Sequence, residues 1–298
     1  MNTSLPRTIP EYLDQLRAAL AGADPALLQD ALYDAEEYLR SELAEHPQRG
    51  EAEVLAEVAS SYGAPEEVAD IYRDTEIRVD RALRPPPPRV RESFLARFFG
   101  VIAEPRTYGA LFYMLLSMAT GIFYFTWVVA GSSLSAGLAI LIVGVPFLIL
   151  FLGSVRMLSL VEGRIVEVML GERMPRRPVY TERDLPWLTR VKNMFTDPRT
   201  WSTLVYFVLM LPIGIAYFTV AVAGLTVSLA LIAAPVLLML GASGALSLDG
   251  IQISIANEPW SWPLSFIGGV LLLFVTLHLA RLVGSWHGRL AKHLLVKA

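Results

Sequence analysis

Two long stretches of the chain carry no charged residue. Residues 107–155 and 200–248 contain no Asp, Glu, Lys or Arg, and each stretch is 49 residues long. A third uncharged run covers residues 259–280. A helix needs about 20 apolar residues to cross a hydrocarbon core of about 30 Å, so each long run has room for two crossings. Most helices of a soluble protein present a polar face to water, and these runs have no such face.

Small residues divide the two long runs into candidate spans. Gly131-Ser132-Ser133 lies in the middle of the first run, and Gly224 lies in the middle of the second. With the third run, the sequence therefore contains five apolar segments. They cover residues 108–130, 134–153, 201–223, 225–248 and 263–283.

The apolar part of the sequence contains an internal repeat. Residues 105–131 and 198–224, which are offset by 93 positions, are identical at 14 of 27 aligned positions, including Pro-Arg-Thr at both starts. A weaker match at an offset of 125 aligns residues 156–170 with 281–295. Apolar composition alone would not reproduce such motifs in register. We interpret the repeat as a duplicated unit whose two copies run the same way through the bilayer.

The distribution of positive charge constrains the topology. Cytoplasmic loops of membrane proteins are rich in Lys and Arg, and both the middle segment and the C-terminal tail are basic here. Five full crossings would put that tail on the opposite side from the N-terminus. We therefore predict four crossings, with residues 225–248 forming a re-entrant or broken segment that turns near Ala234-Pro235. Proline removes a backbone donor at this point, and Gly241 and Gly244 permit an irregular return.

The front of the chain is acidic and is patterned as short helices. Residues 1–90 hold 9 Arg and no Lys against 18 Asp and Glu, a net charge of −9, whereas residues 91–298 carry +6. Thr8-x-x-Glu11 is a capping box, and Asp24-Pro25 is a second helix start. The pattern predicts four amphipathic helices with one modest core. The first residues do not resemble a cleavable signal peptide, so we expect this part in the cytoplasm.

Four consecutive prolines, residues 85–88, separate the two parts and favour an extended spacer. The predicted fold class is all-α, with a small cytoplasmic helical domain and a polytopic helical membrane domain. The domains are residues 1–84 (helical domain), 85–103 (Pro-rich linker and amphipathic lead-in) and 104–298 (membrane domain, with repeats 104–196 and 197–298).

Both parts resemble known families. Residues 9–82 resemble the HAAS signalling domain, on Tyr33-x-x-Glu36-Glu37-Tyr38 and Gly63-Ala64-Pro65-Glu66-Glu67. That resemblance implies an all-helical cytoplasmic module and, as partner, a PadR-like regulator or another signalling protein. Residues 104–295 resemble a bacterial sensor domain found in front of histidine kinases, on the Pro-Arg-Thr starts and the Gly-Ile-x-Tyr-Phe core. No kinase follows residue 298, so output is expected through another protein. Neither resemblance supplies a catalytic residue.

Three groups in the membrane domain are candidates for function. Arg106 and Arg199 occupy equivalent positions before a span, where they either contact anionic lipid headgroups or only anchor the helices. His278 lies near the end of the last span and is either a pH-sensitive group or a packing residue near the membrane surface. The pairs Tyr113/Tyr206 and Tyr124/Tyr217 are interpreted as packing between repeats rather than as a binding cage.

The acidic domain carries the candidate partner surface. Glu36, Glu37, Glu66 and Glu67 are interpreted as an exposed acidic face rather than as paired catalytic acids. We expect this face to dock a cytoplasmic protein with a basic surface, while the proline spacer holds the domain away from the membrane. The alternative is that the acidic domain folds back onto Arg173, Arg176 and Arg177 of its own chain.

The sequence contains no motif that indicates a catalytic or metal-binding site. It lacks a phosphate-binding glycine loop, a nucleophile elbow and a zinc-protease motif. It has no Cys, and the spacing of its four His suggests no metal site. We therefore predict no enzyme activity, no cofactor and no direct binding of nucleic acid.

The predicted function is that of an inner-membrane sensor or signal relay with both termini in the cytoplasm, in contact with membrane lipids and a soluble regulator. A transporter or transporter accessory subunit is the alternative, because duplicated halves and broken helices occur there too. A solvent-filled cavity lined by both repeats and reaching the midplane would distinguish a transporter from a sensor.

Overall fold

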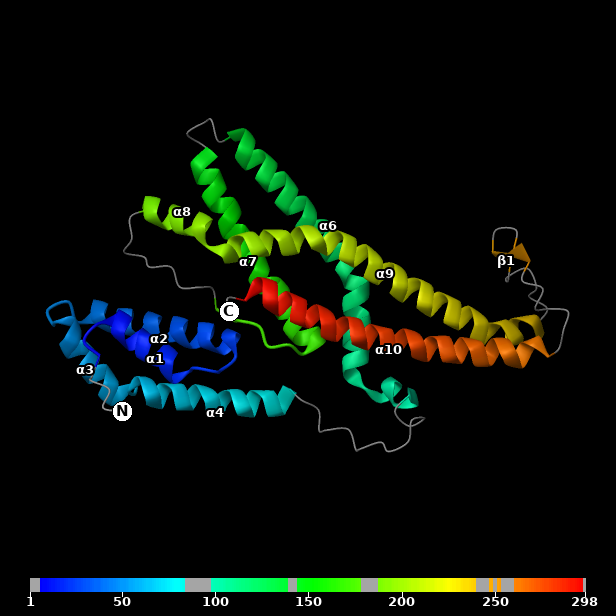
Figure 1. Ribbon diagram of the computed structural model, residues 1–298, viewed down its shortest axis with the longest axis horizontal. Coiled ribbons are helices and arrows are strands. Elements are labelled where there is room, and N and C mark those ends of the chain that lie inside the picture. Colours follow the sequence, from blue (N-terminus) through cyan, green and yellow to red (C-terminus); the bar gives the residue numbers. More distant parts are fainter. Residues whose placement is uncertain are drawn as a thin grey trace.

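The computed structural model describes residues 6–83, 98–138, 144–177, 187–239, 247–248, 251–252 and 260–296. Long helices dominate these residues (Figure 1). The only strands within the described ranges are β1 (Ser247–Leu248) and β2 (Ile251–Gln252), a two-residue antiparallel pair. The predicted all-α fold class is confirmed. The proline spacer lies outside the described residues.

The N-terminal domain contains four helices, of which the first, second and fourth run roughly parallel while the third crosses one end of the group (Figure 1). Thr8 caps the first helix by accepting a hydrogen bond from the Glu11 N–H, and Asp24 caps the second by accepting from the Ala26 N–H. Both caps agree with the sequence patterns, because a side-chain oxygen satisfies a backbone donor that has no partner inside the helix. The helices are α1 (Ile9–Ala19), α2 (Pro25–Glu45), α3 (Glu51–Ser61) and α4 (Pro65–Leu83).

One apolar core holds these four helices together. Tyr12 and Leu16 of α1 are fully buried, and they pack with Leu39 of α2 and Leu55 of α3. Gly63 ends the third helix with a φ of +119°, and its carbonyl oxygen accepts a 2.9 Å hydrogen bond from the Tyr12 hydroxyl. A residue with a side chain adopts this backbone conformation only with strain.

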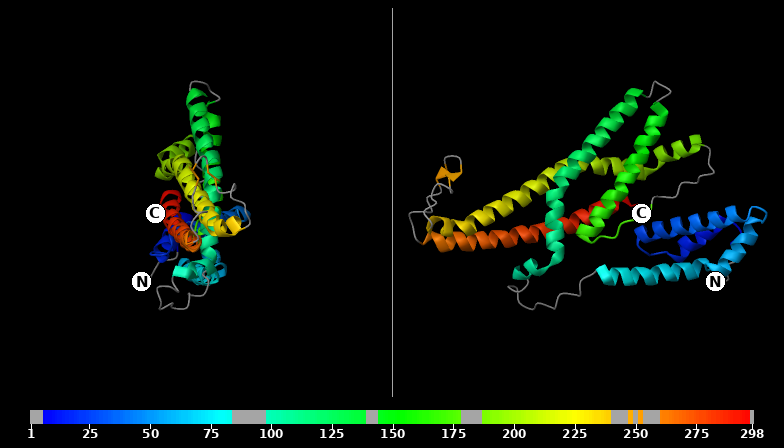
Figure 2. Two further views of the ribbon diagram at one scale, coloured as in Figure 1. Left: turned by 90° about the vertical axis from the view of Figure 1, so that its right-hand side faces the viewer. Right: turned by 180° about the vertical axis from the view of Figure 1, so that it is seen from behind.

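The membrane domain is built from long helices that cross one another (Figures 1 and 2). Among the described residues, four helices are long and apolar enough to span a membrane. They are α6 (Pro105–Leu138), α7 (Gly144–Leu170), α9 (Pro198–Met239) and α10 (Ser261–Leu295). A short 3-10 turn, η1 (Gly100–Ala103), precedes α6, and the short helix α8 (Trp187–Thr196) precedes α9.

The predicted breaks at Gly131 and Gly224 are wrong. Both glycines lie inside continuous helices, α6 and α9. A Cβ at Gly131 would lie 2.1 Å from the Phe151 ring, and a Cβ at Gly224 would lie 2.6 Å from Thr276 Oγ1. The missing side chains therefore serve close packing against α7 and α10 rather than turns.

The predicted re-entrant segment is also corrected. Residues 225–239 continue α9 through Pro235 instead of turning back near it, and Pro212 lies inside the same helix. Proline is tolerated in membrane-spanning helices because neighbouring helices and local adjustments compensate for its missing donor. Four helices are long and apolar enough to span among the described residues, the number of crossings that the sequence predicted. Gly241 and Gly244 lie outside the described residues.

Helices α6 and α9 cross at two equivalent glycines. A Cβ on Gly121 of α6 would lie 2.4 Å from the Met210 carbonyl oxygen, and a Cβ on Gly214 of α9 would lie 2.3 Å from the Ser117 carbonyl oxygen. The four residues form two pairs at the offset of 93 residues. The two backbones therefore touch at equivalent points, as small residues at helix crossings allow.

Other contacts between the halves follow the same offsets. Arg156 on α7 pairs with Asp197 just before α9, at 3.3 Å, and Arg281 on α10 pairs with Glu104 just before α6, at 2.9 Å. The arginines are 125 residues apart and the acids are 93 residues apart. Each unit thus donates an arginine to the acid that precedes the first helix of the other unit.

Candidate functional site: a buried polar cluster and a docked acidic domain

Six polar side chains meet near the crossing of the long helices, and we call them the polar cluster. The acid Glu162 of α7 and the imidazole of His287 on α10 have 0% of their surface exposed. Four tyrosines surround them, two from α6 and two from α9: Tyr113, Tyr124, Tyr206 and Tyr217. Ionisable groups buried in a membrane domain are costly and mark functional sites by default.

Two of the tyrosines bridge the acid and the imidazole. The Tyr113 hydroxyl lies 2.7 Å from Glu162 Oε1 and 2.6 Å from His287 Nε2. The Tyr206 hydroxyl lies 3.0 Å and 2.9 Å from the same two atoms. The sequence prediction that this pair packs between the repeats understates its role, because both hydroxyls are engaged in one hydrogen-bond network.

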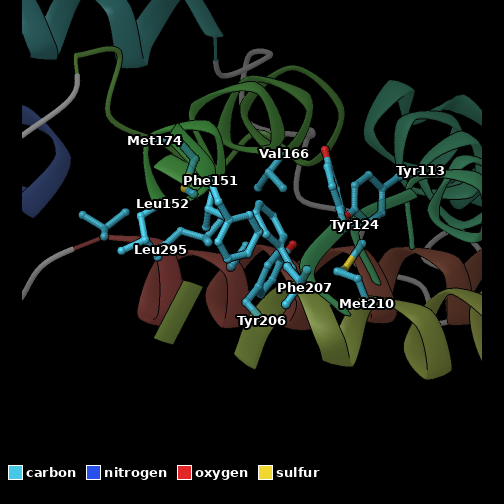
Figure 3. Close-up of a cluster of buried hydrophobic side chains, with 14 residues drawn as sticks. Tyr113, Tyr124, Phe151, Leu152, Val166, Met174, Tyr206, Phe207, Met210 and Leu295 are labelled. Atoms are coloured by element: carbon cyan, nitrogen blue, oxygen red, sulfur yellow. The ribbon is translucent and has the colours of Figure 1, made fainter. Parts of the chain in front are cut away.

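The other two tyrosines each serve one partner. The Tyr124 hydroxyl donates to Glu162 Oε2 at 3.0 Å, and the Tyr217 hydroxyl lies 3.3 Å from His287 Nδ1. Figure 3 shows Tyr113, Tyr124 and Tyr206 within the apolar cluster that includes Phe207 and Met210. The polar cluster is therefore closed off by apolar side chains.

Sequence analysis missed Glu162 and His287, although a signal for them is present. The 125-residue offset that aligns Gly163 with Gly288 also aligns Glu162 with His287. The acid and the imidazole thus occupy equivalent positions in the two units, one residue before an identical Gly-Arg pair. A polar residue recurring at an equivalent buried position would have identified both.

A second site lies where the N-terminal domain docks onto the membrane domain, and we call it the docking contact. Asp30 of α2, which is 5% exposed, is its centre. Its Oδ1 accepts from the backbone N–H groups of Arg176 and Arg177 at 2.8 and 2.9 Å, and its Oδ2 lies 3.4 Å from the Arg173 guanidinium. The three arginines follow the end of α7 directly.

Further pairs surround this centre. Arg177 Nε lies 3.0 Å from Asp34, and its guanidinium stacks over the Tyr33 ring at 5.6 Å. Arg173 also pairs with Glu76 of α4 at 3.4 Å. Of the two arrangements considered from sequence, the structure therefore has the acidic domain folded back onto the arginines of its own chain. The expectation that the spacer holds the domain away from them is wrong for the described residues.

The polar cluster and the docking contact lie on the same two helices. Glu167, five residues after Glu162 on α7, accepts from Arg176 at 3.2 Å. Lys292, five residues after His287 on α10, pairs with Asp24 of the N-terminal domain. Glu167 and Lys292 are again equivalent at the 125-residue offset. At 1.5 Å per residue, about 7.5 Å of helix separates Glu162 from Glu167, beside the docking contact, and His287 from Lys292, within it.

The two candidate lipid-binding arginines have different surroundings. Arg106 is exposed and lies beside Gly171, where a Cβ would meet its guanidinium at 3.5 Å. Arg199 is partly buried, and its Nη1 donates to Gln29 Oε1 of the N-terminal domain at 2.7 Å. Arg199 thus takes part in the docking contact, while lipid binding by either arginine stays a prediction.

The candidate pH-sensitive group His278 lies apart from the polar cluster. Its Nε2 is 3.0 Å from the Phe98 carbonyl oxygen, and its ring stacks on the Phe98 ring at 5.2 Å. Because a carbonyl oxygen only accepts, Nε2 carries a proton in this contact. Whether His278 is a pH-sensitive group or a packing residue stays a prediction.

The four glutamates proposed as a partner surface differ in exposure. Glu36 is buried and pairs with Arg40 at 3.1 Å. Glu37, Glu66 and Glu67 are exposed, and Glu67 accepts from the Ala64 N–H at 3.3 Å at the start of α4. Helical periodicity alone turns Glu36 and Glu37 to different sides of α2, which explains the difference.

These features define a multi-pass helical membrane protein with a separate small helical domain at its front. Residues 113–295, more than half of the chain, match the family described as "Putative sensor", and residues 11–70 match the HAAS family. The chain therefore belongs to that sensor family and carries a HAAS domain, as the sequence motifs indicated. Neither a curated protein nor a solved structure matches it.

Proposed function

We propose that this membrane sensor relays its signal by releasing the N-terminal HAAS domain from the docking contact. In the docked state the acidic residues Asp30, Asp34 and Glu76 are engaged by arginines of the membrane domain. Release frees this acidic surface for a soluble regulator with a basic surface, such as a PadR-like protein. The observation that carries the proposal is the binding of Asp30 by three groups of the segment after α7, namely the Arg173 guanidinium and the backbone N–H groups of Arg176 and Arg177.

The chemistry of the docking contact suits reversible binding. Burial raises the pKa of Asp30, and the backbone N–H groups of Arg177 and Arg176 only partly offset that effect. Arg173 Nε is buried without a hydrogen-bond partner among the described residues. Taking charges out of water costs free energy that imperfect pairing does not fully return. Such a contact holds the domain and still permits its release.

The packing between the repeats favours a relay over the transporter alternative. A transporter would need a solvent-filled cavity lined by both repeats. Among the described residues, the junction of α6 and α9 is instead filled by side chains with at most 1% exposure, namely Tyr113, Tyr206, Phe207 and Met210. A packed junction suits small shifts of helices better than passage of a solute.

We further propose that the HAAS domain and the C-terminus face the cytoplasm, in the inner membrane. The basic segment after α7 and the basic end of α10 support this orientation by the positive-inside tendency. In the native chain, which has no Cys, Glu37→Cys is expected to react with a membrane-impermeant maleimide only after permeabilisation. Gly137→Cys, at the far end of α6, is expected to react in intact cells. Labelling of both positions from the same side would contradict the four-crossing topology.

Two kinds of charge-reversed variant test the proposal that the HAAS domain binds a cytosolic partner. Arg173→Glu combined with Lys292→Glu reverses the membrane side of the docking contact and leaves the HAAS domain unchanged, so capture of a cytosolic partner on tagged full-length protein is expected to increase. Asp34→Lys with Glu76→Lys reverses the HAAS side and is expected to reduce capture. Charge steering predicts that high salt weakens both captures.

The matched control is Asp14→Lys, because Asp14 is an exposed residue paired only locally with Arg17 among the contacts described. Capture that is equal in the two reversed variants, or that persists without residues 1–84, would place the output surface on the membrane domain and contradict the proposal.

A further inference from the structure

In the polar cluster, two tyrosine hydroxyls are shared between the carboxylate of Glu162 and the imidazole of His287. Each tyrosine hydroxyl has one proton to donate and can also accept. Tyr113 and Tyr206 both reach the same carboxylate oxygen of Glu162, and both reach the same imidazole nitrogen of His287. If both hydroxyls donate to an ionised Glu162, then His287 Nε2 must supply the proton for its own contacts with them.

This assignment leaves His287 Nδ1 as the variable atom. Without a proton, Nδ1 accepts from the Tyr217 hydroxyl 3.3 Å away, and with a proton it donates to the same oxygen. All six contacts of the polar cluster are kept in both states, because only the Tyr217 hydrogen bond reverses. The cluster has a net charge of −1 in the first state and of zero in the second.

Burial decides which state holds the helices together. Glu162 and His287 are both 0% exposed, so a net charge here has no contact with water. An unpaired charge in such surroundings is strongly disfavoured, whereas a paired and hydrogen-bonded one is tolerated. The titratable groups facing the pair are Tyr113 and Tyr124 from α6 and Tyr206 and Tyr217 from α9.

We propose that Glu162 and His287 form a proton-binding site at the junction of the two repeats, and that one bound proton holds α6, α7, α9 and α10 in the packed arrangement. When the proton leaves His287, the buried carboxylate is uncompensated and the packed arrangement loses stability. The ligand is a proton from the aqueous phase, and the recurring position of the acid and the imidazole in the two units gives the site its internal symmetry.

The consequence for signalling rests on the proposed function. The helices that carry Glu162 and His287 also carry Glu167, which pairs with Arg176 beside the docking contact, and Lys292, which pairs with Asp24 of the HAAS domain. Loosening of α7 and α10 at higher pH therefore releases the HAAS domain. The proton site itself is independent of that step.

The first test measures thermal unfolding of the full-length protein in lipid nanodiscs as a function of pH. A site that holds a proton only in the packed state contributes stability that is present at low pH and lost as the pH rises. Between the midpoint of the group in the unfolded state and its higher midpoint in the packed state, the folding equilibrium constant is expected to fall tenfold per pH unit for one proton, and above the packed-state midpoint it levels off. Glu162→Gln and the double variant Glu162→Gln/His287→Gln have no net buried charge to neutralise, and their Tm values are expected to lack this decline.

The control is His278→Gln, because His278 is the other imidazole in α10 with a described ring contact and lies outside the polar cluster. It is expected to keep the native pH dependence. An identical decline in the native protein and in the double variant would overturn the proposal, and so would loss of the decline in His278→Gln.

A second measurement does not depend on changing the cluster. With His46, His278 and His293 replaced by Gln, His287 is the one imidazole left in the chain. Nitrogen-15 NMR of labelled histidine is expected to report loss of one ring proton at the upper end of the pH range in which Tm falls. A ring that stays in one protonation state across the pH at which this decline levels off would overturn the proposal.

A third readout separates the proton site from the relay. Spin labels at Glu37→Cys and Arg289→Cys, both exposed positions, report whether the HAAS domain is docked. A stability that responds to pH while docking does not would leave the proton site standing and reject the relay. Docking that responds to pH equally in the native protein and in the double variant would show that the polar cluster does not drive release of the HAAS domain, and would also reject the coupling.

Discussion

Replacing Asp30 by lysine is expected to release the HAAS domain from the membrane domain. Asp30 is 5% exposed and holds two backbone N–H groups and the Arg173 guanidinium, which is 14% exposed. Removing one member of a buried charge pair costs about 3–5 kcal/mol, or roughly a hundredfold or more in the docking equilibrium. A lysine adds repulsion from three neighbouring arginines.

The spin-label pair at residues 37 and 289 measures this release. The native protein is expected to give a narrow distance distribution, and Asp30→Lys a broad one. Asp30→Asn keeps an oxygen that can accept from the Arg176 and Arg177 N–H groups, so its effect is expected to be smaller. An unchanged narrow distribution in Asp30→Lys would mean that Asp30 does not hold the domain in place.

A side chain at the helix crossing is expected to disrupt the whole membrane domain. At Gly121 and Gly214 a Cβ would lie 2.4 and 2.3 Å from backbone carbonyl oxygens of the opposite helix, so the two helices must separate. Overpacking of a core typically costs about 1–3 kcal/mol. The cost here is expected at the upper end for alanine and beyond it for valine, because backbone rather than a flexible side chain must move.

The reciprocal geometry makes this prediction specific. Gly121→Ala and Gly214→Ala are expected to lower Tm by similar amounts, since each meets the equivalent carbonyl group of the other unit. Gly153→Ala and Gly268→Ala are matched controls, because a Cβ at either position meets nothing within 4 Å. Unfolding of detergent-solubilised protein, followed by size-exclusion profiles after heating, measures the difference. Equal Tm values for crossing and control variants would contradict the close backbone contact.

Local patterns in the sequence predicted the helices well. The length of the runs without charged residues identified the membrane domain, and the capping residues Thr8 and Asp24 located the starts of α1 and α2. The family motifs identified both domains. The errors concern where helices end, at glycine and at proline. A glycine can end a helix or let a neighbouring helix approach, and a proline can break a helix or lie within one. Gly131 and Gly224 pack against Phe151 and Thr276, and these neighbours lie on other helices.

The polar cluster was only partly predictable. The tyrosine pairs were visible as a repeat, but Glu162 and His287 differ in residue type and are separated by 125 positions. A search for identical residues therefore passes over them. Their shared location follows from the crossing of α6 and α9, which brings both units to one point. The arrangement of the fold thus turned two unlike residues into one site.

The sequence by itself determined which segments avoid water, where the first helices begin and which family the chain belongs to. These properties depend on hydropathy, charge and caps within one or a few turns of helix. The tertiary structure decided that Gly121 and Gly214 form a crossing, that Glu162 meets His287, and that Asp30 binds the arginines after α7. Each of these is a contact between segments far apart in the chain, whose free energy depends on burial and geometry that only the packed helices create.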